Sequence, residues 1–430
     1  MVRYRKAEFN DRDELLDLIA RGFAVDSQGR VDLREGEDHR ILFTYLYALP
    51  DWDPNRVFVA EEAGRLLAAV GFFPQVLSFA NRDIPVWAIS PVVTAPNQRG
   101  RGLAGHCLNF GMAEVRKRGI TAVFLWGIPD FYPKFGFVPL LPRYRTRLTL
   151  KPGQQFSHGA QATEPGSLRP IVPGDASRIR DLYSAGNSHY WLQPVRTADW
   201  WRDRLAELDI ESGVLREVPY PERRQFLVWE KPGGIVEGYL YFKEEVERAR
   251  IVITEAVAAS YATAAAMLRQ FVAEFVAETD LASQITNVVI LGTPQHFLNS
   301  AAYRMGGTHL DPAPRFGMVK VLDWELFLAA LQPLFQERLQ RAAPDLAQEA
   351  IIRLKLDGTV LKVEKDGAGH SGLRFASKPP ESPEALQLLT RLVFGFYDPS
   401  DLSQIELADE LRQRLFPFQY PFIWDANYLY

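Results

Sequence analysis

Apolar residues recur with two different spacings along the chain, and the changes of spacing predict its helices and strands. Helical spacing predicts three helices in the first part of the chain, at residues 12–23, 39–49 and 102–117. Between them, β-rich runs at 57–61 and 66–73 predict a hairpin turned by Ala63-Gly64. The predicted order of elements is therefore β-α-α-β-β-β-α-β, ending near Pro142.

A similar order of elements recurs further along the chain. Residues 151–166 combine glycine, proline and polar residues without periodicity, which predicts a linker. The elements that follow repeat the order of the first region and predict an internal structural repeat. A third unit has a predicted helix at 324–341, a hairpin turned by Asp357-Gly358 and two further helices, at 383–393 and 405–415. The predicted division is a domain at 1–150, a linker at 151–166, a second domain at 167–318 and a third at 319–430.

Composition narrows the class of protein. The 430 residues are 47% hydrophobic and 24% charged, which suits about three globular domains. A formal net charge of -4 argues against nucleic acid and anionic membranes as partners. The single cysteine, Cys107, forms no internal disulfide and leaves no cysteine cluster for zinc, so we expect a reducing, cytoplasmic setting. The charged residues Arg3, Arg5 and Lys6 predict that no signal peptide starts here, and no uninterrupted apolar run is long enough to span a membrane.

The densest chemical signal is a glycine- and arginine-rich loop at residues 95–102, between a predicted strand and a predicted helix. The first N–H groups of a helix have no acceptor within it, and the helix dipole is positive at that end. Glycines let the backbone approach an anion closely, and Arg99 and Arg101 add positive charge. The loop therefore predicts a phosphate-binding site.

Two nucleotide-binding motifs and one structural alternative compete with this interpretation. Gly100, Gly102 and Gly105 satisfy G-x-G-x-x-G, but four residues separate the strand from the first glycine. The next strand also ends at Gly127 without the acid that would hold a ribose. A Walker A loop would need Gly-Lys-Ser/Thr, which is missing from this loop. The simplest alternative is a solvated basic turn before a core helix.

The same residues carry a family resemblance. Arg99, Gly102 and Ala104 match the acyl-CoA loop Gln/Arg-x-x-Gly-x-Gly/Ala of the GNAT superfamily of N-acetyltransferases. Downstream, FYPKFGF at 131–137 is similar to the aromatic-Gly-aromatic turn near the end of that fold. Over nearly its whole length the chain resembles the Eis (enhanced intracellular survival) group of these enzymes.

The resemblance implies a mixed α/β, that is α+β, architecture. Two tandem GNAT domains would each have a central mixed, mostly antiparallel sheet flanked by helices, and the third domain would be a sterol-carrier-like α+β domain. In the second domain the equivalent junction, at 256–267, has neither glycine nor arginine. That domain is therefore predicted to be degenerate and to have a structural or substrate-shaping role.

The resemblance also implies a reaction. The co-substrate would be acetyl-CoA, with no metal, and the acceptor a small-molecule primary amine: an aminoglycoside, a polyamine, a lysine side chain or an arylamine. A homo-oligomer is expected, hexameric as in the resembling group. The predicted cofactor-binding residues are Val92, Val93, Thr94, Arg99, Gly100, Arg101, Gly102, Leu103 and Ala104.

Catalysis would need an oxyanion site, an acid and a base. Pro91 lies in the strand before the loop and predicts a bulge, which would free N–H groups of Val92, Val93 or Thr94 for the thioester carbonyl. Tyr132 stands where Eis-type enzymes place the general acid, and a phenol and a thiol have ordinary pKa values of about 10 and about 8.5. The base would be the terminal carboxylate of Tyr430, held by an aromatic tail.

Other interpretations of these residues stay open. Tyr132 could be a packing aromatic, and the tail could only pack on the third domain or on a neighbouring subunit. The mixed charges at 26–40 fit a solvated loop better than a pocket for a cationic amine, and His106 and Cys107 fit packing roles. The alternative function is a carrier of hydrophobic ligands, in which the third domain binds the ligand and the GNAT domains are scaffold.

Overall fold

A computed structural model of the chain describes most of its residues. The described ranges are 1–26, 28–48, 52–79, 82–128, 130–150, 164–187, 192–206, 224–276, 285–310, 317–341, 351–365, 371–407 and 409–417. Most of the predicted linker, the aromatic tail from 418 onward and Tyr430 lie outside these ranges.

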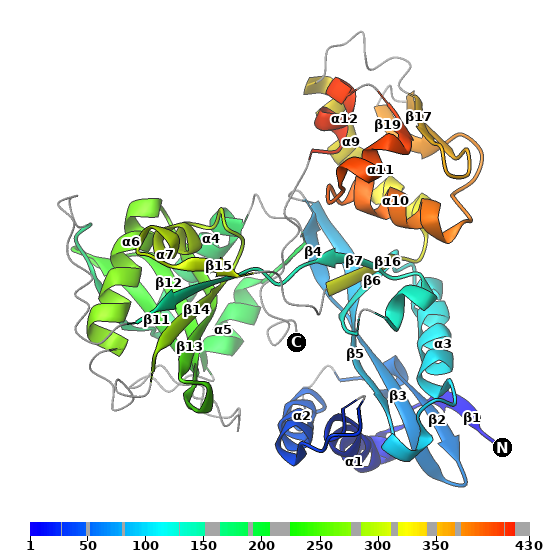
Figure 1. The fold of residues 1–430 in the computed structure, drawn as a ribbon, viewed down its shortest axis with the longest axis horizontal. Helices are drawn as coiled ribbons and strands as arrows, with labels where there is room; N and C mark the ends of the chain where they lie inside the picture. The colour runs from blue at the N-terminus through cyan, green and yellow to red at the C-terminus, as the bar shows by residue number, and fades with distance from the viewer. Residues whose placement is uncertain are drawn as a thin grey trace.

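The first sheet has nine strands, seven of them in the order β1-β2-β3-β5-β6-β16-β7. Its strands are β1 (Arg3–Lys6), β2 (Val57–Glu62), β3 (Arg65–Phe73), β4 (Val76–Phe79), β5 (Arg82–Thr94), β6 (Ala122–Trp126), β7 (Val138–Leu141), β10 (Gln193–Pro194) and β16 (Gly317–Val321). Helices α1 (Arg12–Phe23) and α2 (Leu33–Leu46) pack on one face, and α3 (Leu103–Lys117) packs on the other (Figure 1). Only β5 and β6 pair in parallel, so this sheet is mixed and mostly antiparallel, as predicted.

The short-range predictions in this domain hold with one correction. The structure confirms α1, α3 and the β2–β3 hairpin, whose turn places Ala63 at φ 52° and Gly64 at φ 74°. α2 begins at Leu33 rather than at residue 39, because the second half of the charged stretch expected to be a loop, residues 33–40, is helical. Asp32 Oδ1 accepts the N–H of Glu35 at 3.1 Å at this end.

The second sheet has seven strands in the order β15-β8-β14-β13-β12-β11-β9. Its strands are β8 (Arg145–Thr149), β9 (Ser167–Pro170), β11 (Arg224–Lys231), β12 (Ile235–Glu245), β13 (Arg250–Ala258), β14 (Asn287–Leu291) and β15 (Thr308–Leu310). Its helices are α4 (Ala176–Asn187), α5 (Ala198–Ala206), α6 (Tyr261–Gln270) and α7 (Phe297–Arg304). Again one pair, β13–β14, is parallel, so the second sheet repeats the plan of the first.

The two domains share a side-chain network as well as an order of strands. Arg5 on β1 donates to Asp11 at 2.6 and 2.9 Å and to Glu61 on β2 at 2.6 Å. At the equivalent place Arg169 donates to Asp175 at 2.8 and 2.9 Å and also to Glu230 on β11. The internal repeat predicted from the order of elements therefore extends to individual ion pairs.

Three strands cross between the domains, and the shortest is β10, which lies in the range predicted for the second domain but pairs with β4 of the first sheet. β8 lies inside the sequence range predicted for the first domain but pairs with β14 and β15 of the second sheet. β16, which follows the second sheet in the sequence, lies between β6 and β7 of the first. Each sheet is therefore completed by a strand from the other side of a predicted boundary, which local periodicity could not indicate.

The third domain has a four-stranded sheet in the order β19-β18-β17-β20. Its elements are α8 (Trp324–Ala330), α9 (Gln332–Arg341), β17 (Ile351–Leu354), β18 (Val360–Lys365), β19 (Ser371–Phe375), α10 (Pro383–Val393), α11 (Pro399–Ser403), β20 (Ile405–Glu406) and α12 (Asp409–Leu415). The helix predicted at 324–341 is two helices, with Pro333 in the first turn of the second. The helix predicted at 405–415 begins with the short strand β20, which pairs with β17.

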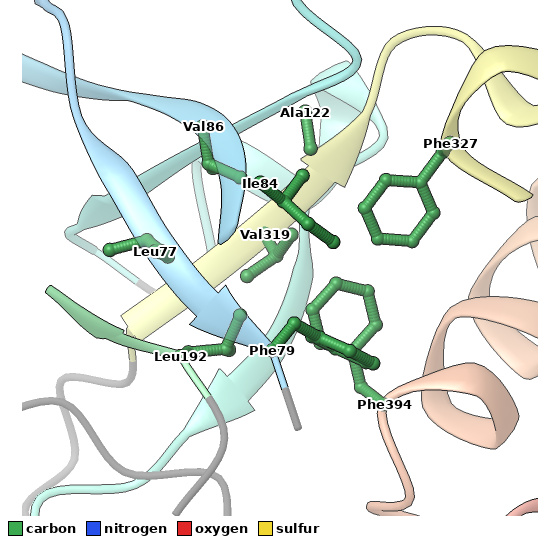
Figure 2. A pocket seen from close by; sticks show the side chains of 9 residues that line it. All are labelled: Leu77, Phe79, Ile84, Val86, Ala122, Leu192, Val319, Phe327 and Phe394. Atoms are coloured by element: carbon green, nitrogen blue, oxygen red, sulfur yellow. The ribbon is translucent and has the colours of Figure 1, made fainter. Parts of the chain in front are cut away.

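An apolar core joins the third domain to the first sheet. The buried side chains at this junction enclose a cavity of about 10 Å³, roughly the space of one water molecule (Figure 2). Its lining comes from β4, β5, β6, β16, α8, the residue after α10 and the segment before β10, namely Leu77, Phe79, Ile84, Val86, Ala122, Leu192, Val319, Phe327 and Phe394. The cavity is too small for a lipid and lies apart from the glycine- and arginine-rich loop.

Candidate active site

The backbone of the loop before α3 is arranged to bind an anion. Gly100 and Gly102 have φ values of 80° and 74°, a conformation that glycine adopts without strain. Gly102 is the N-cap of α3 and provides no side-chain acceptor. The first bond within the helix runs from His106 N–H to the carbonyl of Gly102 at 3.1 Å, so the N–H groups of Leu103 and Ala104 have no acceptor in the helix. A phosphate oxygen could therefore bind here.

Beside this loop, β5 and β6 diverge. They pair in parallel only from Val86 to Ala88, although β5 continues to Thr94. The register with β3 shifts opposite Pro91, which confirms the predicted interruption of the strand. Val92, Val93 and Thr94 keep their pairing with β3. Because successive N–H groups of a strand point to opposite edges, at least one in this triplet faces the gap beside β6.

Tyr132 lies in a short 3-10 helix, η4 (Tyr132–Phe135). This helix follows β6 in the sequence and packs in space against the first turn of α3. It is 7% exposed, and a Cβ atom placed on Gly127 would lie 2.0 Å from its Cε2 atom. A Cβ placed on Gly105 of α3 would lie 2.8 Å from Phe135 Cζ. The first close contact places Tyr132 against the end of β6, and the second places its turn against the loop helix.

The two arginines of the loop have different surroundings. The Arg99 guanidinium donates to the carbonyls of Gly22, Val25 and Asp26 at 2.7, 2.7 and 2.8 Å. Arg101 is exposed and contacts Gln98 and Glu62. The contacts of Arg101 are therefore near the loop, whereas those of Arg99 are at the C-terminal end of α1.

Of the two residues next to the loop, Cys107 has the packing role predicted for it, whereas His106 is exposed. Cys107 is fully buried, and desolvation raises the pKa of its thiol to about 12. Its thiolate is therefore scarce at neutral pH, which excludes it as a nucleophile. The His106 ring lies 5.1 Å from the ring of Tyr4.

One further residue at this site comes from a distant part of the chain. Lys320 on β16 donates from Nζ to the carbonyl of Phe135 at 2.6 Å, and burial lowers the pKa of its ammonium group. This contact supports the turn that carries Tyr132. Sequence reasoning missed it because the two residues are separated by 185 positions in the sequence, and the exchange of β16 brings them together.

The second domain lacks the features of an anion site at the equivalent junction. Ser260 caps α6 with its own side chain, accepting the N–H of Thr263 at 3.0 Å. After β14 the sequence Gly-x-Pro-x-x-aromatic recurs, with Gly292 in the place of Gly127, His296 in the place of Phe131 and Phe297 in the place of Tyr132. This repeated motif was a signal available in the sequence. At these positions the second domain has a helix end capped by Ser260 and a phenylalanine in place of the tyrosine.

The terminal carboxylate of Tyr430, predicted as the base, lies outside the described residues. Within the described ranges, no cluster of three or more His, Cys, Asp or Glu side chains is placed to hold a metal ion. No helix in that part of the chain has the length and apolar character needed to cross a bilayer.

The comparisons with known proteins agree with this geometry. Residues 3–140 match the family model described as acetyltransferase (GNAT) domain. No curated protein matches the chain. The matched range holds the loop, the β5–β6 gap and Tyr132.

Solved structures share the fold over the whole chain. A GCN5-related N-acetyltransferase from Anabaena variabilis aligns with a TM-score of 0.67 and 15% identity, covering 99% of this chain and 100% of that one. One from Kribbella flavida aligns at 0.63 and 16%, covering 99% and 98%. Eis1 from Mycobacterium abscessus aligns at 0.60 and 13%, covering 99% and 100%. At these identities the likeness shows the shared fold.

Proposed function

We propose that this enzyme transfers the acetyl group of acetyl-CoA to a primary amine. It is an acyltransferase, and its residues 3–140 form a GNAT acetyltransferase domain. The observation that carries the proposal is the open N-terminus of α3, next to the gap between β5 and β6 and to the turn of Tyr132. These features provide an anion site, free backbone donors and a phenol within one region of the first domain.

The loop residues fit the phosphates of coenzyme A. The N–H groups of Leu103 and Ala104 would donate hydrogen bonds to the diphosphate, Gly100 and Gly102 would let it approach the backbone, and Arg101 would offset its charge. Acetyl-CoA supplies the acyl thioester. An N–H group of Val92, Val93 or Thr94 that faces the gap would stabilise the oxyanion of the reacting carbonyl.

Two proton transfers complete the proposed mechanism. Tyr132 would give its phenolic proton to the leaving sulfur. A free alkyl amine has a pKa of about 10.4, so at neutral pH a base must remove a proton before the amine can attack. We assign that role to the terminal carboxylate of Tyr430, because an aromatic tail can hold a chain end in place.

The finer features of the protein are proposals as well. The acceptor is an aminoglycoside, a polyamine, a lysine side chain or an arylamine, and the enzyme acts in the cytoplasm as a homo-oligomer, with a hexamer as the expected form. The third domain is proposed to be sterol-carrier-like. Among the described residues, the cavity at the junction of that domain with the first sheet has room for about one water molecule, which does not support the carrier function.

Calorimetry with acetyl-CoA tests the first step. We expect one molecule bound per chain, because Ser260 occupies the equivalent helix end in the second domain. Absence of binding would refute the proposal, and two molecules per chain would refute the assignment of the second domain as degenerate.

An acetyl-transfer assay against a panel of the four amine classes tests the second step. It should be run in parallel on the native chain and on a chain extended beyond Tyr430. Extension should slow transfer while leaving acetyl-CoA affinity unchanged. Equal rates would show that the terminal carboxylate is not the base.

A further inference from the structure

We infer that Arg99 is a positioning residue, which couples the cofactor loop to the α1–α2 segment and so holds one wall of the acceptor site. This inference rests on the proposed function, and it assigns Arg99 a role different from the phosphate contact expected from sequence. The evidence for this inference is three hydrogen bonds at the end of α1 and the packing of that helix on β5.

The contacts of Arg99 all lie on one short segment. Its guanidinium donates to the carbonyls of Gly22, Val25 and Asp26, at and just beyond the C-terminal end of α1. Carbonyls at a helix C-terminus lack partners within the helix and carry the negative end of its dipole, so a cation is favourable there. Arg99 therefore neutralises a helix end while its backbone belongs to the cofactor loop.

The same end of α1 lies against the strand proposed to hold the oxyanion. A Cβ atom placed on Gly22 would lie 2.1 Å from Val93 Cγ2 and 3.4 Å from the carbonyl oxygen of Thr94. The helix end thus approaches β5 where the reacting carbonyl is proposed to bind. The segment that continues from it is proposed to run beside the path of an incoming amine.

That segment is ordered by its own hydrogen bonds. Asp32 N–H donates to the carbonyl of Ala24 at 2.7 Å, and Val25 and Val31 form an antiparallel bridge. Asp26 Oδ1 accepts the N–H of Arg30 at 2.9 Å. Val31 remains 66% exposed and Leu33 76% exposed, so an apolar surface faces solvent beside the site. This surface suits the carbon skeleton of an amine acceptor.

The contacts of Arg99 predict that the binding of acetyl-CoA and the binding of the amine acceptor influence each other. Acetyl-CoA bound on the loop would restrict the backbone of Arg99, and the three contacts would pass that restraint to the α1–α2 segment. Coupling of binding free energies is reciprocal, so an ordered segment would also favour the loop geometry that binds acetyl-CoA.

The test compares Arg99→Gln with Arg101→Gln in the full chain, because both arginines are in one loop and only Arg99 contacts α1. Hydrogen–deuterium exchange of the peptide spanning 22–32 is measured with and without acetyl-CoA, and acetyl-CoA affinity is measured by calorimetry. In Arg99→Gln we expect exchange about three- to tenfold faster, no protection by acetyl-CoA, and a loss of acetyl-CoA affinity of about two- to threefold that reflects the lost coupling. In Arg101→Gln we expect native exchange and about three- to tenfold weaker binding.

Arg99→Lys is the rescue variant, because an ammonium group can donate to some of the same carbonyls and should restore part of the protection. Native exchange in Arg99→Gln, or a larger loss of acetyl-CoA affinity there than in Arg101→Gln, would overturn the inference. If the native protein binds no acetyl-CoA, the proposed function fails, whereas exchange in the free variants still decides whether Arg99 holds the segment.

Discussion

Tyr132 lies so close to Gly127 that a Cβ atom at position 127 would come within 2.0 Å of its Cε2 atom and 2.6 Å of its Cδ2 atom. Gly127 is the first residue after β6, and Tyr132 opens the turn that follows. The rings of Phe131 and Phe137 meet Tyr132 edge-on at 5.0 and 5.9 Å. The position of the phenol is therefore fixed by the absence of a side chain at one residue and by aromatic packing at two others.

Substitution Gly127→Ala should displace Tyr132 without emptying the cofactor loop. The added methyl group must move the ring, because neither the strand end nor the aromatic cluster leaves space for it, and overpacking of this kind costs about 1–3 kcal/mol. We expect the turnover number to fall by about tenfold or more while acetyl-CoA affinity stays near native. Steady-state kinetics with calorimetry measure both.

Gly174→Ala is the matched control, since a Cβ there would meet no atom within 4 Å. It should leave turnover unchanged. A native rate in Gly127→Ala would contradict a catalytic role for the placement of Tyr132.

Tyr132→Phe removes only the hydroxyl group. The ring packing would stay, so the cofactor should bind as before, and loss of a general acid typically lowers turnover by about 10²–10⁴. The second domain already carries phenylalanine at the equivalent position, Phe297. The measurement is turnover with acetyl-CoA and a reactive amine, together with the Kd of acetyl-CoA. A loss of affinity equal to the loss of rate would indicate that Tyr132 only packs.

Features set by neighbouring residues could be predicted from the sequence. The hairpin turns at Ala63-Gly64 and Asp357-Gly358 need left-handed backbone, and the sequence marks this with glycine; Gly64 and Gly358 have φ values of 74° and 72°. The loop before α3 was equally visible, since strand, glycines and helix are contiguous. Local chemistry fixes such features, and a family motif can then be matched to them.

Features set by distant residues could not be predicted in this way. The apolar pattern of β16 would be the same in the first sheet or the second. The local sequence therefore did not indicate that this strand lies between β6 and β7. The hydrogen bond of Lys320 depends on that placement. The contacts of Arg99 likewise depend on where α1 ends, although its position in the motif suggested a phosphate ligand.

The exchange of β16 predicts that the first domain depends on a residue far along the chain. Met318 is fully buried, pairs with Leu125 and Pro139, and belongs to the core under α3. Met318→Ala should reduce the free energy of unfolding by about 2–5 kcal/mol and weaken acetyl-CoA binding. Urea unfolding and calorimetry provide the two readouts.

The control is Leu326→Ala on α8, where the side chain is 51% exposed and a change within about 0.5 kcal/mol is expected. Native stability and native acetyl-CoA affinity in Met318→Ala would show that the first domain folds without support from β16.

Lys320 predicts a pH dependence of stability. Burial lowers its pKa below the ordinary value, so in the window between that lowered pKa and about 10.4 the unfolded chain binds more protons than the folded one. The free energy of unfolding contributed by this residue must therefore rise as pH increases through the window. Relative to Lys320→Met, the native protein should become more stable from pH 7.5 to 10, as measured by urea unfolding at several pH values. Other titrating groups are common to both proteins and cancel in the difference.

Lys117→Met, which removes a lysine whose side chain is 74% exposed, should give a nearly constant difference. Parallel curves for the native protein and Lys320→Met would mean that Lys320 is not held in a desolvated position against the carbonyl of Phe135.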